Sequence, residues 1–453
     1  MAQILNGLCG IGVKLVLDRL SGRLGAIAGA VAVGLLFHQP AFYVNWGRFT
    51  QLASQSIMLA AWLVTFDTLR HWVRADAGRT RATLFRQGLA AALLTAAVFL
   101  LHFRVFAFYV ALLAPSLVMV IGRDWSAARW RRLVTGSLYI GGVALVFVSS
   151  ALWDALAQYR ASITLAAPRQ LVSTEEQRVG AQRYYEFPLE AYYGLGIHRH
   201  MAWASLVAAA LGLLRRNGLV VLATVWTALL LGLGYAYLLP VRWLAITNLG
   251  AVIIMLYLPA SLAIGVAVEE LYRLVCRRFA WAARPSLWAA AMVAAGLVVA
   301  PYRARDLETY RYFVTESDVR AMDWIRANTA PDALFAVNTY FWLPTMAHGM
   351  DAGYWIPYFT GRRMTAGVML VDQADVAYQA RILELSRLVE QAKSDPLAVA
   401  GLQEQGVDYI YLGPIGNIYT GPLDAQVLRS SPLVETVYDE DGVVILRIKA
   451  VHP

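Results

Sequence analysis

Long apolar segments, interrupted at short intervals by arginine, fill the first 300 residues of this chain. Of its 453 residues 59% are hydrophobic and only 15% are charged, which is too apolar for a soluble protein of this length. A helix that crosses a bilayer needs about 20 mostly apolar residues. Nine segments approach this requirement: 24–41, 51–67, 87–103, 105–121, 134–153, 200–214, 218–238, 249–268 and 286–300. The sequence therefore predicts a polytopic α-helical membrane protein with about nine transmembrane helices.

Basic residues are distributed unevenly between the predicted helices. With a cytoplasmic N-terminus, the inner segments hold 18 Lys and Arg residues, whereas the short outer loops hold only Arg48, Arg104 and Arg242. Because cytoplasmic loops carry the excess of Lys and Arg, this orientation is favoured. An odd number of spans then places residues 301–453 outside the cytoplasm. We expect a multi-pass protein of the bacterial cytoplasmic (inner) membrane, with the lipid bilayer as its first partner.

The charge balance changes at residue 301. Residues 1–300 have a net charge of +15, and residues 301–453 have 13 basic and 19 acidic residues, a net charge of −6. The high isoelectric point thus follows from membrane topology and does not indicate a nucleic-acid partner. We expect two domains, a transmembrane helical domain over 1–300 with a long outside loop over 153–200, and an extracytoplasmic domain over 301–453.

Residues 301–453 show the alternation of helix and strand that is typical of an α/β domain. Thr315 and Asp318 have capping-box spacing at the start of a helix that ends before Pro331. Short strands are predicted over 333–338 and 407–413, and an amphipathic helix over 375–393. Residues 433–450 read as a hairpin with Asp441-Gly442 at its turn.

Arginine, histidine and aromatic residues gather in the predicted outer loops. The stretch 38–55 carries Asn45 and Arg48 but no acidic residue, and His102 and Arg104 interrupt a 35-residue apolar run. A guanidinium holds phosphate through a bidentate fork, so Arg48, Arg104 and Arg242 are candidate ligands of an anionic substrate. The alternatives are that the aromatic residues are interfacial anchors, and that His102 and Arg104 form the polar tip of a helical hairpin.

Two further segments hold candidate residues. Residues 348–367 contain Asp351, Tyr354, Trp355 and the pair Arg362-Arg363 with little periodicity, which predicts an ordered binding loop rather than a helix or strand. The alternative is a buried aromatic plug in which Arg362 bonds to Asp351. Glu175 and Glu176 lie in the long outside loop, either as catalytic carboxylates or as the solvated first turn of a helix. His198 and His200 lack an evident third metal ligand, so no metal site is expected.

Four stretches carry a resemblance to a known group of proteins. They are "NWGRFTQLASQ" (45–55), "AMDWIRANTAPDALFAVN" (321–338), "DAGYWIPYFTGRR" (351–363) and "GVDYIYLGP" (406–414). They resemble segments in the later half of uncharacterised bacterial polytopic glycosyltransferases of the GT-C superfamily. The resemblance implies transfer of a sugar from a polyprenyl-phosphate donor to an extracytoplasmic acceptor. It also implies Arg48, Arg242 or Arg362-Arg363 as phosphate ligands.

The chain departs from that group in one respect. Such enzymes usually carry an acidic residue in the first outside loop, as a base or metal ligand, and residues 38–50 have none. Three explanations stay open: the matching loop lies in an N-terminal part absent from this chain, catalysis uses Asp351, Glu175 or Glu176, or the protein is not catalytic. A truncated or split chain is favoured. A divalent cation is a candidate cofactor.

Two other functional classes compete with the glycosyltransferase. A transporter would need ionisable groups at mid-membrane, but the charges of the predicted spans lie near their ends. A non-catalytic scaffold or assembly subunit of a cell-envelope complex, with a membrane partner subunit, fits the missing acidic residue equally well. The sequence leaves the sugar, the acceptor and any partner unnamed.

Overall fold

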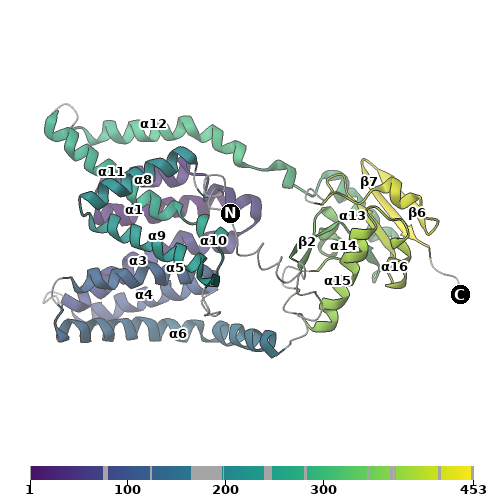
Figure 1. Cartoon of the computed structure of the whole chain (residues 1–453), viewed down its shortest axis with the longest axis horizontal. Coiled ribbons are helices and arrows are strands. Elements are labelled where there is room, and N and C mark those ends of the chain that lie inside the picture. The colour runs from purple at the N-terminus through teal and green to yellow at the C-terminus, as the bar shows by residue number, and fades with distance from the viewer. Residues whose placement is uncertain are drawn as a thin grey trace. The chain divides into compact units, whose positions relative to one another are not determined.

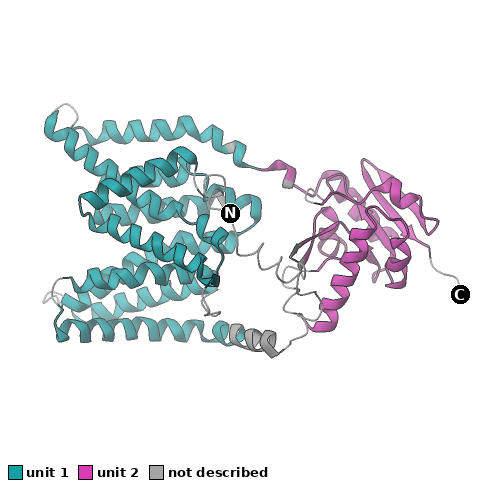
Figure 2. Cartoon of the chain, in the orientation of Figure 1, with its two compact units in different colours: residues 1–155, 185–307 teal, residues 156–184, 308–453 magenta. Residues whose placement is uncertain are grey.

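The computed structural model divides the chain into two compact units, which Figure 2 shows in different colours. One unit comprises residues 1–155 and 185–307, and the other comprises 156–184 and 308–453. The structure describes residues 2–449 except 75–79, 123–124, 165–195, 197, 239–246, 280–282, 344–345, 368–370, 372–373 and 417–419. Each unit has its own hydrophobic core.

The first unit is a bundle of helices with a multi-pass membrane character (Figure 1). Within the described residues, six helices are long and apolar enough to cross a membrane, and the stretches 23–36, 199–214 and 218–234 are shorter apolar helices. Each of the nine predicted segments falls on one of these nine, and the number that cross the bilayer stays a prediction. The elements are α1 (Ala2–Leu20), α2 (Arg23–Val31), η1 (Ala32–Leu36), η2 (Ala41–Trp46), α3 (Phe49–Arg74), α4 (Arg81–Leu101), α5 (Phe103–Ile121), α6 (Ala127–Thr164), α8 (Arg199–Leu214), α9 (Gly218–Gly234), η5 (Ala236–Leu238), α10 (Leu249–Ile253), α11 (Tyr257–Arg278), α12 (Pro285–Arg303) and η8 (Ala304–Asp306).

Helix α1 is an element that the hydropathy pattern did not reveal. Its buried residues Cys9, Val13, Val16 and Leu17 recur at helical spacing and form one apolar face. The helix turns back at Ser21 and Gly22 and packs along α2 and η1 as far as η2. The first turn of α1 therefore lies at the opposite end of the bundle from Arg19 and Arg23. The orientation predicted from the sequence places the N-terminus on the same side as these two arginines, and the structure separates them.

Part of the long outside loop predicted over 153–200 is helical, and its location outside the membrane stays a prediction. Residues 153–164 continue α6, which runs from Ala127 to Thr164, well past the apolar segment that predicted it. The reason is that hydropathy marks where a helix is apolar and not where it ends. Residues 165–195 lie outside the described part of the chain.

Most of the arginines that the sequence analysis placed on the inner side do gather at one end of the bundle. Arg19 at the end of α1 pairs with Asp67 near the end of α3, at 3.1 Å. Arg132 near the start of α6 donates to the Val73 carbonyl in the last turn of α3, at 3.3 Å. We call this the arginine-rich end. Which side of a membrane it faces stays a prediction.

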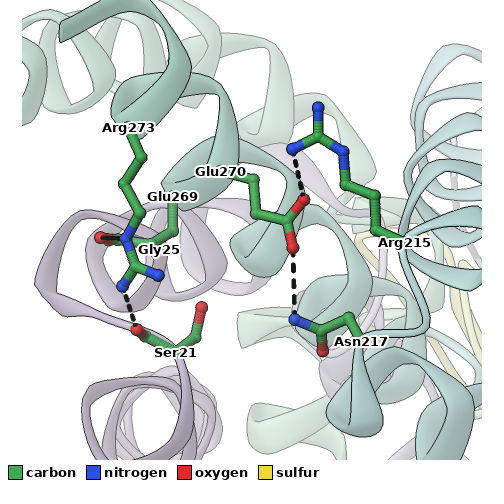
Figure 3. A network of polar contacts seen from close by, with 7 residues as sticks. All are labelled: Ser21, Gly25, Arg215, Asn217, Glu269, Glu270 and Arg273. Carbon is green, nitrogen blue, oxygen red and sulfur yellow. Dashed lines mark hydrogen bonds and ion pairs between the residues drawn. The ribbon is translucent and has the colours of Figure 1, made fainter. Parts of the chain in front are cut away.

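Two neighbouring carboxylates of α11 hold two separate turns at the arginine-rich end (Figure 3). The buried Glu269 accepts a hydrogen bond from the Gly25 amide at 3.0 Å and pairs with Arg273, which donates to the Ser21 carbonyl. Glu270 accepts from Arg215 at 2.9 Å and from Asn217 at 3.3 Å. The α1–α2 turn and the α8–α9 turn are thereby both fastened to α11, and the Glu269 carboxylate stabilises the positive N-terminal end of α2.

The second unit contains a five-stranded sheet in the order β4-β1-β5-β7-β6. β1 is parallel to β4 and β5, and β7 is antiparallel to β5 and β6. The strands are β1 (Leu334–Ala336), β4 (Arg363–Met364), β5 (Tyr409–Leu412), β6 (Val434–Glu440) and β7 (Val443–Ile448), with a separate hairpin of β2 (Thr339–Leu343) and β3 (Met346–Gly349). The remaining elements are η9 (Thr309–Arg311), α13 (Glu316–Asn328), η10 (Ala352–Trp355), α14 (Ile356–Thr360), α15 (Val376–Gln391), α16 (Ala398–Glu404) and α17 (Ala425–Arg429).

Alternation along β1 explains why this sheet is covered on both faces. Leu334 and Ala336 belong to a core cluster with α15 and α16, whereas Phe335 belongs to a cluster with α13 and α14. The predicted α/β architecture is confirmed. So are the Thr315–Asp318 capping box and the hairpin turn, in which Asp441 and Gly442 both have positive φ.

The stretch 348–367 is not the irregular loop that the sequence predicted. It contains the end of β3, the 3₁₀ turn η10, the short helix α14 and the strand β4. Asp351 caps η10, and Gly361 ends α14 with φ of 75°, a conformation that glycine adopts without strain. Elements of two to five residues are too short to produce a periodic pattern, so the sequence could not reveal them.

Close packing of α2 against α11 generates a first prediction. A Cβ on Gly265 would lie 2.7 Å from the Gly25 carbonyl oxygen, whereas a Cβ on Gly141 in α6 would meet nothing within 4 Å. We expect Gly265→Ala to destabilise the bundle by about 1–3 kcal/mol through overpacking. Gly141→Ala, the matched control, should be neutral or stabilising by about 0.5–1 kcal/mol. Thermal unfolding of both variants in detergent measures the difference, and equal melting temperatures would contradict the close contact.

Candidate functional site

The chain from η1 to α3 forms the first part of the candidate site. η1 ends at Leu36, and the following turn η2 buries Phe42 and Tyr43 in the bundle. Gly47 then takes φ of 60°, which turns the chain into α3 directly after Arg48. The Arg48 guanidinium lies over the Trp46 ring, 5.1 Å from its centroid. The local sequence thus fixes Arg48 at the start of α3 beside an aromatic surface.

The α4–α5 turn brings His102 and Arg104 to the same end. Ser54 in the second turn of α3 donates to the Val98 carbonyl at 2.8 Å, so the start of α3 lies beside the last turn of α4. His102 follows that turn, and Arg104 lies over the Phe103 ring at 5.6 Å. Burial, together with the positive charges of Arg104 and Arg48, lowers the pKa of His102 to about 4. His102 is therefore a neutral imidazole near pH 7.

Buried polar atoms without partners accompany these two arginines. Gln51 in the first turn of α3 is only 2% exposed, and its Nε2 has no hydrogen-bond partner within the described part of the chain. The same holds for Nδ1 of His102. A buried polar group left unpaired costs about 1–3 kcal/mol, so such groups commonly serve a ligand. We call Arg48, Gln51, His102 and Arg104 the basic cluster.

The surroundings of the basic cluster favour an anion. The stretches 37–66 and 87–122, which supply the cluster, contain no Asp or Glu. α3 and α5 both begin there, and helix N-termini carry a partial positive charge. Arg48, His102 and Arg104 were predicted from the sequence as substrate-binding residues, and the structure brings them together. Gln51 was missed, because its significance depends on its burial.

A second group of polar residues lies at this end, around Asp306 at the end of η8. The Asn45 amide donates to the Asp306 backbone carbonyl at 2.6 Å. Nδ1 of His38 lies 3.3 Å from Oδ2 of Asp306, and Arg303 lies 3.0 Å from the same oxygen. Asn45 was a predicted binding residue, and its amide is engaged in this contact. Asp306 was missed because the apolar pattern ends at residue 300. Residues after that point, Asp306 among them, were predicted to belong to the α/β domain.

In the second unit, Asp351 is part of a buried network. Its carboxylate accepts hydrogen bonds from the Asn338 amide at 2.6 Å and from the Gly353 backbone at 2.8 Å, and it is 1% exposed. Asn338 in turn accepts from the Leu423 amide. Burial raises the pKa of Asp351 to about 7. That value suits a general base, but the carboxylate is enclosed, so its catalytic role stays a prediction.

The other predicted residues of this unit have mostly structural contacts. Arg362 donates to the carbonyls of Arg326 and Thr329 at 2.8 Å each, which caps the C-terminal end of α13. The alternative in which Arg362 bonds to Asp351 is therefore wrong. Arg363 donates to the Asp332 carbonyl, and Tyr354 is half-buried. Trp355 is exposed and packs edge-on against Tyr358, which is 78% exposed.

Three predicted residues, Glu175, Glu176 and Arg242, lie outside the described residues. Among those that are described, no group of three or more His, Cys, Asp or Glu side chains could hold a metal ion. The divalent cation stays a prediction.

Comparisons with protein-family models and with curated proteins each give no match. Comparison with solved structures finds the oligosaccharyltransferase of Archaeoglobus fulgidus. With a disulfide-tethered acceptor peptide containing the NVT sequon, that structure has 13% sequence identity and a TM-score of 0.45, over 90% of this chain and 56% of that one. The structure of the same enzyme in complex with an inhibitory peptide and a dolichol-phosphate has 13% sequence identity and a TM-score of 0.43. That match covers 90% of this chain and 57% of that one. The apo form has 14% sequence identity and a TM-score of 0.45, and the match covers 90% of this chain and 57% of that one.

This chain thus spans little more than half the length of those proteins.

The Asp351 network generates a prediction of pH dependence. The folded state keeps the proton of Asp351 up to about pH 7, whereas the unfolded chain releases it near the ordinary value of 3.8. Stability of the second unit should therefore fall as the pH rises from about 4 to 7, since the folded state binds more protons there. Amide hydrogen exchange at Gly353 and Leu423 measures this as a loss of protection. Asp351→Asn should remove that pH dependence, and protection that is constant in the unsubstituted protein would contradict the account.

Proposed function

We propose that this protein is a membrane glycosyltransferase that holds the phosphate of a polyprenyl-phosphate-linked sugar at the basic cluster. The observation that carries the proposal is the convergence of Arg48 and Arg104 with the neutral His102 at the start of two apolar helices. A membrane-embedded anion with a long apolar tail matches both features. The archaeal oligosaccharyltransferase found with dolichol-phosphate is a neighbour for which such a ligand is named.

The chemistry of the cluster suits a phosphate that becomes a leaving group. Two guanidiniums supply planar donors with a fixed positive charge, and the Gln51 amide and the neutral His102 supply further hydrogen-bonding groups. Charge develops on the phosphate as the bond between the sugar and its oxygen breaks. Donors already in place stabilise that charge without reorganisation, and in a site of low dielectric this accounts for much of a rate enhancement.

The surface beside the cluster suits the lipid tail. Leu100, Leu101 and Phe103 flank His102 and are exposed apolar side chains. A polyprenyl chain entering sideways along α4 and α5 would cover them, while its phosphate reaches the basic cluster. In the predicted orientation this end faces the extracytoplasmic side.

The proton acceptor for the acceptor hydroxyl is a separate question. The elements that supply the cluster have no carboxylate, so Asp351 or Glu175 remains the proposed base. A non-catalytic subunit that binds the lipid phosphate without transferring the sugar is the alternative that this feature favours.

Removal of one guanidinium at a time tests the phosphate site. We expect Arg48→Ala and Arg104→Ala each to weaken binding of polyprenyl phosphate by about ten- to a hundredfold, as a hydrogen bond to a charged group contributes about 1.5–3 kcal/mol. Arg305→Ala is the matched control, because Arg305 is an exposed arginine that lies over Tyr302 near the end of α12. Native mass spectrometry of the purified protein in nanodiscs measures the affinities. Binding unchanged in both variants would reject the assignment.

Transfer of a radiolabelled sugar separates the enzyme from the scaffold. The purified protein, supplied with polyprenyl-phosphate-linked sugars and cell-envelope acceptors, should give product that is lost in Arg48→Ala. Lipid-phosphate binding with no transfer from any donor would support the non-catalytic alternative.

A further inference from the structure

The Asp306 group joins three segments that are far apart in the sequence. Asp306 ends η8, directly after α12, and its backbone carbonyl accepts a hydrogen bond from Asn45 in η2. Its carboxylate lies within 3.3 Å of His38 and 3.0 Å of Arg303. All three side chains in these polar contacts are mostly buried. A single residue therefore holds both ends of the segment 38–45.

The same segment is anchored a second time inside the bundle. Tyr43 accepts a hydrogen bond from the Gln55 amide at 2.8 Å, and Gln55 accepts one from the Tyr257 hydroxyl at 2.9 Å. Tyr43, Gln55 and Tyr257 are fully buried. Since only Trp46 and Gly47 separate Asn45 from Arg48, the position of η2 sets where Arg48 lies relative to the α4–α5 turn.

The negative charge of Asp306 makes two opposite predictions for its effect on phosphate binding possible, one from electrostatics and one from its contacts. A carboxylate at the same end as a site for phosphate repels the ligand, so electrostatics alone predicts that its removal strengthens binding. Its contacts with His38 and Arg303 predict the opposite, because without them the segment leading to Arg48 loses an anchor. The sign of the effect therefore distinguishes the two roles.

We propose that the Asp306 carboxylate is a positioning group for the basic cluster, acting through His38 on the segment that leads to Arg48. The inference rests on the proposed function of that cluster as a phosphate site. Asp306 does not contact the phosphate, and its contribution is to keep Arg48 beside His102.

A double-mutant cycle with Arg48 tests this role in the full-length protein in nanodiscs, with polyprenyl phosphate as the probe. Asp306→Ala should weaken binding by about three- to tenfold, although it removes a negative charge, and Asp306→Asn, which keeps an acceptor oxygen, should weaken it less. In the Arg48→Ala background, Asp306→Ala should cause no further loss. Asp18→Ala, which removes an equal charge paired with Lys14 on α1, is the control and should leave the affinity unchanged.

The outcomes separate this inference from the function on which it rests. Tighter or unchanged binding in Asp306→Ala, or a full additional loss in the Arg48→Ala background, would overturn the positioning role while leaving the phosphate site intact. Unchanged binding in Arg48→Ala and Arg104→Ala would overturn the phosphate site itself. If Asp306→Ala does not fold, His38→Ala removes the same side-chain contact from its other partner, with the same expected loss and the same lack of additivity.

Discussion

A bilayer cannot solvate charges or unpaired polar groups, and this constraint determines where polar and charged side chains lie in the helical unit. Several buried polar side chains of the described helices find partners inside the bundle, as Tyr109 does with Thr65 and Thr95 and Trp62 does with Ser116. Ionised side chains gather near the helix ends, because burying them in hydrocarbon is costly. The ends are consequently where the chemistry of such a protein can occur, and the two ends of this bundle differ.

At the arginine-rich end, arginines are neutralised by carboxylates of the bundle. Glu269 and Glu270 bind Arg273 and Arg215, and Asp67 binds Arg19, so these charges fasten turns together. At the other end, Arg48 and Arg104 lie on aromatic rings beside a histidine that stays neutral, and residues 37–66 and 87–122, which supply them, contain no Asp or Glu. At the arginine-rich end, the positive charges therefore take part in ion pairs that stabilise the fold. At the other end, the positive charges of Arg48 and Arg104, beside the neutral His102, favour the binding of an anion.

The sequence predicted what depends on local pattern. Each of the nine predicted apolar segments falls on an apolar helix in the part of the chain that the structure describes, and the capping box at Thr315 and the Asp441-Gly442 turn were correct because short-range backbone geometry determines them. Helix α1 escaped notice because Lys14, Asp18 and Arg19 on its outer face lower its hydropathy, although its inner face is apolar. The elements within 348–367 are too short to have a period.

Contacts between distant residues were beyond prediction. Asp306 meets His38 only because α12 returns to the end of the bundle where η2 lies, a pairing across more than 260 residues that no motif encodes. The burial of Gln51 and the enclosure of Asp351 likewise depend on tertiary packing. Arg48, His102 and Arg104 were identified by residue type, but their convergence required the fold.

The central claim is that the lipid phosphate binds at the end of the bundle formed by η2 and the α4–α5 turn. Photo-crosslinking with a polyprenyl phosphate that carries a diazirine next to the phosphate tests it most directly, with adducts mapped by mass spectrometry. The account predicts adducts on residues 43–48 and 100–106, lost upon competition with unlabelled polyprenyl phosphate. Adducts confined to the arginine-rich end, on residues 70–86 or 270–278, would contradict it.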